Sequence, residues 1–476
     1  MDILHQPLSG KTRHEHDLLG DREVPVEYYF GVQTLRGVEN FKTSGIKINH
    51  YPEMINALAM VKEAAAIANC ELGYMDTKKK DAIVKACREI YKEGKLYDHF
   101  VVDVIQGGAG TSTNMNANEV IANRALEILG YQRGEYQYCH PNNDVNLAQS
   151  TNDAYPTGMK LAIVIANKRL VEVLKTLVDA FRKKAKEFEH VVKMGRTHLQ
   201  DAVPMTLGQE FEGYAVALDE AVGTLEETVK NFYANNMGAT AVGTGINSDP
   251  DYPPLVSKYL SEITGLPMVP AKNLVQATND TTGFVLYSSV LKYLAVKLSK
   301  TCNDLRVLTS GPRTGIGEIN LPPMQPGSSI MPGKVNPVIA EVVSQIAFRV
   351  IGNDHAATMG SEAGQLELNV MEPVIVASIF DSITVLKNGM EILRDKCIAG
   401  ITANEERCKD LVLHSIGLVT ALNPYIGYEA STAIAKEAME TGRGVYELVL
   451  EKKLLSQEQL DDILAPENMI KPRKMK

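Results

Sequence analysis

Apolar residues recur with helical spacing along much of this chain. Two sets of them, spaced at about i, i+4, i+7 and i+11, each mark one face of a helix. The sets are Leu170, Leu174, Leu177 and Phe181, and Leu291, Leu294, Leu298, Cys302 and Leu305. Patterns that alternate apolar and polar residues, which are typical of strands, are scarce. The chain therefore predicts a mainly all-α fold.

Proline placement suggests how long these helices are, because a proline inside a helix removes a backbone donor and clashes with the preceding turn. The proline-free stretches run between residues 156 and 204, 204 and 250, 270 and 312, and 337 and 373. Each could hold a helix of about 30 residues, roughly 45 Å long. Helices of that length need partners along their whole length, which predicts a bundle within the chain and between chains.

A chain of 476 residues exceeds the size at which a single hydrophobic core stops growing. We expect a three-domain subunit with a central long-helix bundle domain at residues 150–397. An N-terminal mixed helical domain at residues 1–149 precedes it, and a small C-terminal helical domain at residues 398–476 follows it. No internal repeat stands out.

Composition narrows the class of protein. The chain is 45% hydrophobic and 22% charged, as in ordinary globular proteins, and its net charge of −9 disfavours a nucleic-acid-binding surface. The apolar stretch at residues 284–298 contains Lys292 and Lys297 and is too short to span a membrane. The first 20 residues show no signal-peptide pattern, and the six cysteines are scattered without CxxC spacing. We expect a soluble cytoplasmic protein with reduced thiols.

Four segments are rich in Gly, Ser, Thr and Asn, and two of them lie in the first third of the chain. GGAGTSTNMN, at residues 107–116, combines glycines that allow close backbone approach with hydrogen-bonding groups at Thr111, Thr113 and Asn114. QSTND, at residues 149–153, precedes a long helical run whose start is marked by Pro156. The first segment could bind a ligand closely, and the second could bind an anion at a helix N-terminus. Either could instead simply cap a helix.

The other two segments flank later helical runs. GRTHLQDAVP, at residues 195–204, carries Thr197 and His198, although a lone histidine near a helix boundary is also a common capping residue. GSSIMPGKVNP, at residues 327–337, is harder to explain by structure alone, since it combines small residues, two prolines, a cation and an amide. Loops of this composition are candidates for lids that close over a substrate.

Several other chemistries fail on spacing. The 327–337 loop has five residues between its glycines, and Val335 follows its lysine, so it is not a Walker A phosphate loop. The glycines near residue 315 do not form a dinucleotide fingerprint. His14 and His16, which flank Glu15, lack zinc spacing, and no GxSxG nucleophile motif is present. We therefore expect no metal site.

Taken together, GTSTNMN, QSTND, GRTHLQDAVP and GSSIMPGKVNP resemble the ordered signature set of the aspartase/fumarase superfamily. The resemblance extends from DLLGDREVP near the start to GITANEERC and NPYIGYEAS near the end. It implies a homotetramer built around a long-helix bundle, with active sites shared between three subunits. It also implies elimination of a small group from a four-carbon dicarboxylate, without a required cofactor.

The resemblance implies roles for residues of the last two segments. Ser328 would be the base, acting as an alkoxide, with Ser329 and nearby backbone N–H groups as donors. Lys334 and Asn336 resemble the family's clamp for the substrate α-carboxylate, assisted by Thr197. Loss of a proton from C3 places a second negative charge on the neighbouring carboxylate, giving an aci-carboxylate intermediate that the enzyme must bind more tightly than substrate.

The β-carboxylate, which receives that charge, would be bound by residues of the first two segments. Thr111, Ser150 and Thr151 resemble the family's donors to it, while Asn152 and His198 would lie near the leaving amino group, His198 as a possible accessory catalytic residue. In the aspartase branch the reaction is the reversible conversion of L-aspartate to fumarate and ammonia.

Two alternatives stay open from the sequence. His198 keeps class II fumarase as a rival, because malate dehydration needs a proton donor. Ala109, Thr151, the LQDAVP stretch and residues 359–375 (MGSEAGQLELNVMEPVI) favour the aspartase branch. A non-catalytic helical scaffold on the same fold is the second alternative. Whether Mg²⁺ activates the enzyme is not readable from the sequence.

Overall fold

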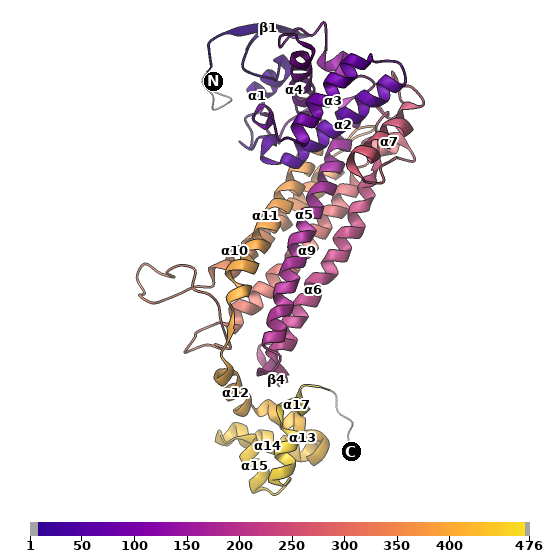
Figure 1. Cartoon of the computed structure of the whole chain (residues 1–476). Coiled ribbons are helices and arrows are strands. Elements are labelled where there is room, and N and C mark those ends of the chain that lie inside the picture. Colours follow the sequence, from indigo (N-terminus) through magenta and orange to yellow (C-terminus); the bar gives the residue numbers. More distant parts are fainter. Residues whose placement is uncertain (1–7, 472–476) are drawn as a thin grey trace. The chain divides into compact units, whose positions relative to one another are not determined.

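The computed structural model describes residues 8–471, and helices dominate this part of the chain (Figure 1). The mainly all-α prediction is confirmed. Five helices have 22 or more residues each. They are α5 (Thr151–Glu187), α6 (Leu207–Thr228), α9 (Thr282–Leu308), α10 (Val338–Glu362) and α11 (Glu372–Lys396). Among the described residues, no helix is both long and apolar enough to cross a membrane.

The chain packs as two compact units, and the boundary between them falls inside all five long helices. Unit 1 contains residues up to 171, with 223–293 and 348–386, and unit 2 contains 172–222, 294–347 and residues from 387 onward. The three-domain division at 149/150 and 397/398 stays a prediction. Residues 1–7, on which part of the signal-peptide argument rests, and residues 472–476 lie outside the described part.

The two apolar stripes recognised in the sequence are the buried faces of α5 and α9. All nine of their residues are buried, none more than 2% exposed. Helix α5 begins at Thr151, however, and not at Pro156, which lies inside its second turn. Proline cannot donate to the carbonyl four residues earlier, and here the Asn236 amide donates to that Asn152 oxygen at 3.0 Å. A side chain therefore replaces the missing helical bond.

Unit 1 is built around α2 (Pro52–Glu71), an alanine-rich helix that contacts α3 (Thr77–Tyr91), α4 (Thr111–Leu129) and α7 (Tyr252–Thr264). Because three helices surround it, α2 is buried around most of its circumference. The shorter elements of the unit complete its surface. They are the hairpin β1 (Thr12–Asp17) and β2 (Gly20–Pro25), α1 (Val32–Asn40), the π-helix Pro141–Val145, α8 (Leu274–Asn279), and the parallel pair β5 (Ala234–Asn235) and β6 (Val269–Pro270).

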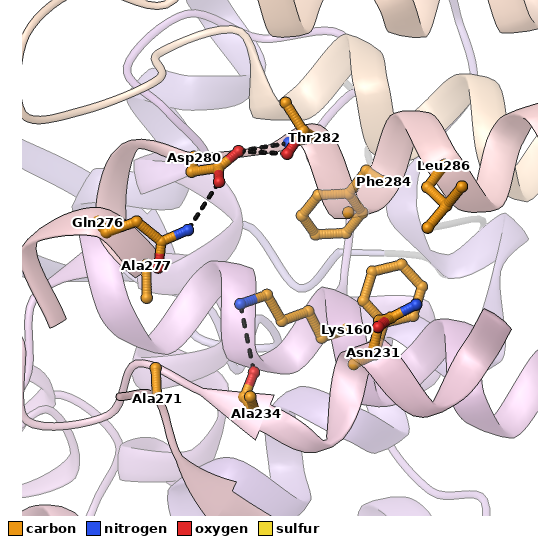
Figure 2. Close-up of a pocket in the computed structure, with 12 residues that line it drawn as sticks. Lys160, Asn231, Ala234, Ala271, Gln276, Ala277, Asp280, Thr282, Phe284 and Leu286 are labelled. Carbon is orange, nitrogen blue, oxygen red and sulfur yellow. Dashed lines mark hydrogen bonds between the residues drawn. The ribbon is translucent and has the colours of Figure 1, made fainter. Parts of the chain in front are cut away.

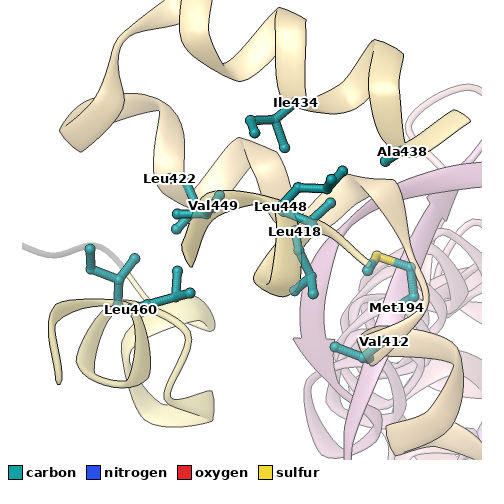
Figure 3. Packing of buried hydrophobic residues seen from close by; sticks show 11 residues of the cluster. Met194, Val412, Leu418, Leu422, Ile434, Ala438, Leu448, Val449 and Leu460 are labelled. Atoms are coloured by element: carbon teal, nitrogen blue, oxygen red, sulfur yellow. The ribbon is translucent and has the colours of Figure 1, made fainter. Parts of the chain in front are cut away.

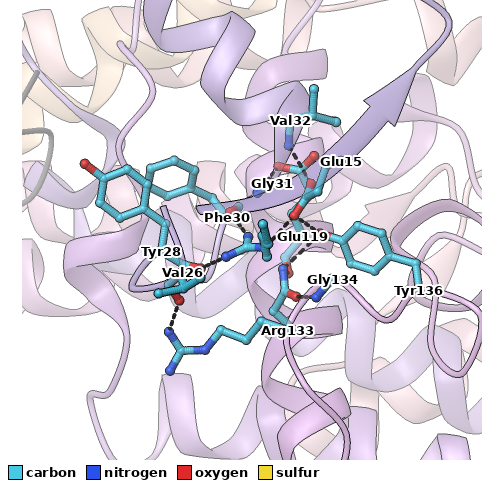
Figure 4. Close-up of polar contacts among 12 residues, drawn as sticks. Glu15, Val26, Tyr28, Phe30, Gly31, Val32, Glu119, Arg133, Gly134 and Tyr136 are labelled. Atoms are coloured by element: carbon cyan, nitrogen blue, oxygen red, sulfur yellow. Dashed lines mark hydrogen bonds and ion pairs between the residues drawn. The ribbon is translucent and has the colours of Figure 1, made fainter. Parts of the chain in front are cut away.

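Two buried carboxylates hold the start of α1 (Figure 4). Glu119 accepts from the backbone N–H groups of Gly31, Gln33 and Thr34, and Glu15 accepts from that of Val32. These are the N–H groups that a helix leaves unpaired at its N-terminus. Burial, reinforced by the neighbouring Glu15, raises the pKa of Glu119 to about 7. Glu15, the residue between His14 and His16, therefore caps α1.

Unit 2 contains the antiparallel hairpin β3 (Val192–Thr197) and β4 (Gln200–Thr206) and a group of short helices after residue 404. Figure 3 shows the apolar cluster that joins them: Met194 of β3 packs among leucines and valines of the C-terminal helices. The Ser415 hydroxyl also donates to Asp201 of β4 at 2.8 Å. The short helices are α12 (Glu405–Leu413), α13 (Val419–Ile426), α14 (Tyr428–Thr441), α15 (Val445–Glu451), α16 (Gln457–Ile463) and α17 (Pro466–Met469).

Candidate active site

The ten candidate residues fall into two groups, one in each unit. Those of unit 1 sit at two helix starts, and those of unit 2 sit in a hairpin turn and a loop. Unit 1 holds Thr111, Ser150, Thr151 and Asn152, and unit 2 holds Thr197, His198, Ser328, Ser329, Lys334 and Asn336.

The QSTND segment forms the start of α5. Ser150 caps the helix, because its hydroxyl accepts from the Asn152 N–H at 3.2 Å while Asp153 accepts from the Ser150 N–H at 2.9 Å. The two hydrogen bonds together pair two backbone N–H groups at the start of α5. The Asn152 side chain is already engaged, donating to the Ala241 carbonyl at 2.7 Å. Both functions weighed for this segment, cap and anion site, remain compatible with the geometry, because the helix N-terminus still carries positive partial charge.

Asp153 ties this helix start to a second loop. Its side chain is fully buried and also accepts from the backbone N–H groups of Gly238 (3.2 Å) and Thr240 (2.9 Å). Burial raises the pKa of Asp153 to about 7, against the opposing effect of these hydrogen bonds. The segment 238–241 is therefore held beside Ser150. A cavity of about 490 Å³ opens there, with Gln149, Ser150 and Thr240 among its lining residues.

The GGAGTSTNMN segment forms the start of α4, as the helix-cap reading predicted. Three consecutive residues, Gly108, Ala109 and Gly110, have positive φ. A side chain on Gly110 would meet the Tyr155 ring at 2.7 Å, so glycine is required for α4 to approach α5. The exposed Thr111 hydroxyl donates to the Gly108 carbonyl at 2.7 Å and must leave that oxygen before it can donate to a ligand.

Lys62 of α2, which the sequence analysis missed, contacts residues at the start of α4 and just before α5. It is completely buried, and its ammonium donates to the side-chain oxygens of Asn114 (2.8 Å), Asn146 (2.9 Å) and Gln149 (2.8 Å). Burial lowers the pKa of Lys62 to about 7, partly offset by Asp153. Three acceptors nevertheless match the three N–H groups of the protonated form. A lysine within the apolar run of residues 57–68 is the signal that could have revealed it.

The segment with Thr197 and His198 is a hairpin and not a helix boundary, which corrects the context expected for this histidine. Thr197 pairs with Gln200, and the turn between them consists of His198 and Leu199, with φ of 57° and 60°. Two positive φ values define a type I′ turn, which normally uses Asn or Gly. This strained turn exposes the side chains of Thr197 and His198 to solvent.

A buried ionic cluster holds the base of this hairpin. Glu318 is fully buried and lies 3.0 Å from the ammonium of Lys193 and 2.8 Å from the guanidinium of Arg196. The residue that follows Arg196 is Thr197. Glu318 also leads into the short strand β7 (Ile319–Asn320), which precedes the 327–337 loop and pairs with β8 (Thr402–Ala403). The sequence analysis missed Glu318, since a lone acidic residue after a glycine-rich turn carries no distinctive pattern.

The 327–337 loop closes on itself. The Gly327 N–H donates to the Lys334 carbonyl at 2.7 Å, and the Asn336 amide donates to the Gly327 carbonyl at 2.9 Å. A side chain on Gly327 would meet that Lys334 oxygen at 2.7 Å. Helix α10 starts directly after the loop, as the sequence predicted. Lys334 is exposed, and within residues 8–471 it has no ion-pair partner.

The hydroxyl of Ser328 lies in a tight turn of the loop. Its oxygen accepts from the backbone N–H groups of Ile330 and Met331, both at 3.1 Å. Two fixed donors aimed at one oxygen stabilise negative charge on it. Ser329 is exposed beside it.

A second polar cavity of the described chain is lined by none of the candidate residues. In this cavity, shown in Figure 2 and of about 460 Å³, the Lys160 ammonium faces Gln276 and Asp280 and makes one long hydrogen bond, 3.4 Å, to the Ala234 carbonyl. Among the described residues, no group of three or more His, Cys, Asp or Glu side chains is arranged to hold a metal ion.

Comparison with known proteins bears on what these groups do. A family model described as "Lyase" matches residues 20–352, and one described as "Fumarase C C-terminus" matches residues 418–471. An aspartate ammonia-lyase of Pseudomonas fluorescens is 61% identical over 98% of this chain and 97% of its own length. The aspartate ammonia-lyase of Escherichia coli K12 is 53% identical, over 98% of this chain and 97% of its own length.

Solved structures agree on the fold. A cobalt-bound crystal structure titled fumarate lyase:delta crystallin, from Brucella melitensis, has a TM-score of 0.94 and 52% identity, covering 97% of this chain and 100% of that one. Recombinant class II fumarase from Schistosoma mansoni has a TM-score of 0.92 at 36% identity, covering 98% of this chain and 100% of that one. The architecture is thus shared, while sequence identity is higher to the ammonia-lyases than to this fumarase.

Proposed function

This chain belongs to the lyase family whose model covers residues 20–352, and from that membership we propose that it acts as an aspartate ammonia-lyase. The reaction is the reversible elimination of ammonia from L-aspartate to give fumarate. One observation carries the choice of ammonia over water: relatives named aspartate ammonia-lyase are 53 to 61% identical over nearly the full length. The class II fumarase of Schistosoma mansoni is 36% identical.

The proposed chemistry begins at Ser328. Its alkoxide takes the C3 proton, and the N–H groups of Ile330 and Met331 that already point at its oxygen lower the cost of forming that charge. The remaining electron pair moves into the adjacent β-carboxylate, giving the aci-carboxylate dianion. Each donor aimed at such a charge contributes about 3 to 4 kcal/mol in comparable sites.

Recognition of the substrate is assigned by motif to both groups of residues. Thr111, Ser150 and Thr151 would donate to the β-carboxylate, and the positive end of α5 suits an anion there. Lys334, Asn336 and Thr197 would bind the α-carboxylate, with Ser329 as a further donor. Asn152 and His198 would lie near the amino group.

Departure of the amino group does not require a strong general acid. The electron pair of the dianion forms the C=C bond of fumarate while the C–N bond breaks. Because the amino group is protonated, it leaves as neutral ammonia. For this reason we propose that no cofactor is required and that His198 has at most an accessory role. We also propose a cytoplasmic location, since all six cysteines are free thiols.

The proposed function is tested with two substrates. The protein is expected to form fumarate, followed by ultraviolet absorbance, from L-aspartate and not from L-malate. Dialysis against EDTA is expected to leave the rate on L-aspartate unchanged. Activity on malate alone would overturn the proposal in favour of fumarase. No turnover of either compound by the folded protein would favour the non-catalytic scaffold.

We further propose that the active form is a homotetramer with shared active sites. Large apolar side chains on α9 and α10 remain exposed in the single chain, among them Leu286, Phe348 and Met359, at 51 to 64% exposure. Apolar surface of this kind on long helices is typical of a face that packs against another subunit. The two groups of candidate residues would then come from different subunits.

Mixing variants tests this sharing. Ser328→Ala and Thr151→Val should each be severely impaired alone, and hybrids formed by co-expression should regain activity, because some sites then combine an intact loop with an intact α5 start. Two variants of the same group, Ser328→Ala and Lys334→Met, provide the control and should not complement. Sedimentation equilibrium reports the oligomer directly. A monomer with full activity, or hybrids without recovery, would contradict sharing.

A further inference from the structure

We propose that Lys62 is a positioning residue that makes the Thr151 hydroxyl a hydrogen-bond donor toward the substrate β-carboxylate, acting through the side-chain amide of Asn114. The inference rests on the proposed function, which places Thr151 against that carboxylate. All three residues lie in unit 1, and hydrogen bonds connect them in sequence. Neither Lys62 nor Asn114 needs to touch the substrate.

The first step of the relay is the orientation of the Asn114 amide. Asn114 is 1% exposed, and its Oδ1 accepts from the Lys62 ammonium at 2.8 Å. An ammonium only donates, so the amide oxygen must face Lys62 and the amide nitrogen must face the other way. The other two acceptors of Lys62, on Asn146 and Gln149, use the remaining N–H groups, so the ammonium is fixed.

The second step is the polarity of the Thr151 hydroxyl. Asn114 Nδ2 donates to Thr151 Oγ1 at 3.2 Å and to Asn146 Oδ1 at 3.1 Å. Because a donor already occupies one side of the hydroxyl oxygen, the hydroxyl hydrogen must point elsewhere. Within residues 8–471 this hydroxyl donates to no protein group. It is therefore available to donate to an anion at the start of α5.

The third step is electrostatic. Within the described residues Lys62 makes no ion pair, and the buried Asp153 acts on its charge without direct contact. That charge polarises the amide and, through it, the hydroxyl. The effect should grow with the negative charge on the β-carboxylate, which is larger in the dianionic intermediate than in the substrate. The relay thus predicts a larger effect on kcat than on KM.

The substitution Asn114→Asp tests the relay most directly. The new carboxylate keeps a partner for Lys62, but it presents an oxygen to Thr151, whose hydroxyl must then turn and donate to the protein. We expect kcat on L-aspartate to fall by about 10² to 10³-fold, as when one donor is removed from an oxyanion site. KM should change much less, and circular dichroism should show a folded protein.

A double-mutant cycle separates the relay from simple charge repulsion by the new carboxylate. In the Thr151→Val background, Asn114→Asp should cost far less than in the wild type, because the donor is already absent. Equal losses in both backgrounds, or an unchanged kcat in Asn114→Asp, would overturn the relay. The matched control is Asn116→Asp, since Asn116 is also buried but bonds only to the backbone of His99 and Val101. It should retain the wild-type ratio of kcat to KM.

Two further experiments keep the relay testable if Asn114→Asp does not fold or if the proposed function is wrong. If Asn114→Asp does not fold, Asn114→Ala replaces it in the cycle, with an expected loss of about tenfold. Binding of succinate, which carries both carboxylates and no leaving group, is measured calorimetrically in the same four proteins. An inactive wild type would refute the proposed function, but the succinate measurements would still decide the relay. The relay is supported if Asn114→Asp weakens succinate binding in the wild type and not in the Thr151→Val background. It is overturned if the loss of binding is the same in both backgrounds or is absent.

Discussion

Replacing Ser328 by alanine is expected to reduce turnover of L-aspartate by up to about 10⁴-fold, the upper end of what a general base contributes. The hydroxyl oxygen of Ser328 is the atom at which the N–H groups of Ile330 and Met331 converge. Alanine leaves these two donors without an acceptor and removes the group that takes the proton. Initial rates of fumarate formation measure the loss.

The neighbouring residue supplies the matched control. Ser329→Ala also removes one hydroxyl from the loop, but no backbone donors converge on that residue, so we expect about a 10²-fold loss, as for a single donor. Both variants should keep the wild-type circular dichroism spectrum and oligomeric state, because Ser328 and Ser329 are at the surface of unit 2. Full activity in Ser328→Ala would exclude this serine as the base.

Helix positions could be predicted from the sequence because they depend on local periodicity. The stripe from Leu291 to Leu305 is buried in α9 as expected. The start of α5 was placed at Pro156, five residues late, since proline is common in a first helical turn. What the sequence does not show is that the distant Asn236 amide takes over the lost hydrogen bond. Such compensation depends on tertiary structure.

The candidate residues were located by motif, whereas the residues that hold them were not. The hairpin around His198 was missed because its turn lacks the Asn or Gly that normally marks a type I′ turn. Lys62 and Asn114 lie 52 positions apart in the chain, and their contact depends on the packing of α2 against α4. Spacing within a segment predicts local structure, but contacts of this range follow only from the fold.

The largest effect on stability is expected for Glu318→Ala. Its carboxylate lies between the Lys193 ammonium and the Arg196 guanidinium, and both the carboxylate and Lys193 are almost fully buried. Without Glu318, Lys193 keeps only its ion pair with Glu210, at 2.5 Å, and Arg196 loses its carboxylate partner. Removing one member of a buried ionic cluster costs about 3 to 5 kcal/mol. We expect a decrease of that size in the free energy of unfolding, measured by urea denaturation with circular dichroism, since the chain has no tryptophan.

An exposed ion pair of the same unit shows what burial contributes. Arg182 and Asp219 lie 2.8 Å apart, but their side chains are 43% and 45% exposed, so Asp219→Ala should cost less than about 1 kcal/mol. Equal losses for the two substitutions would mean that Glu318 does not hold the hairpin. Because Arg196 directly precedes Thr197, a loosened hairpin should also raise KM for L-aspartate in Glu318→Ala. A lower stability with unchanged KM would confine the role of Glu318 to folding.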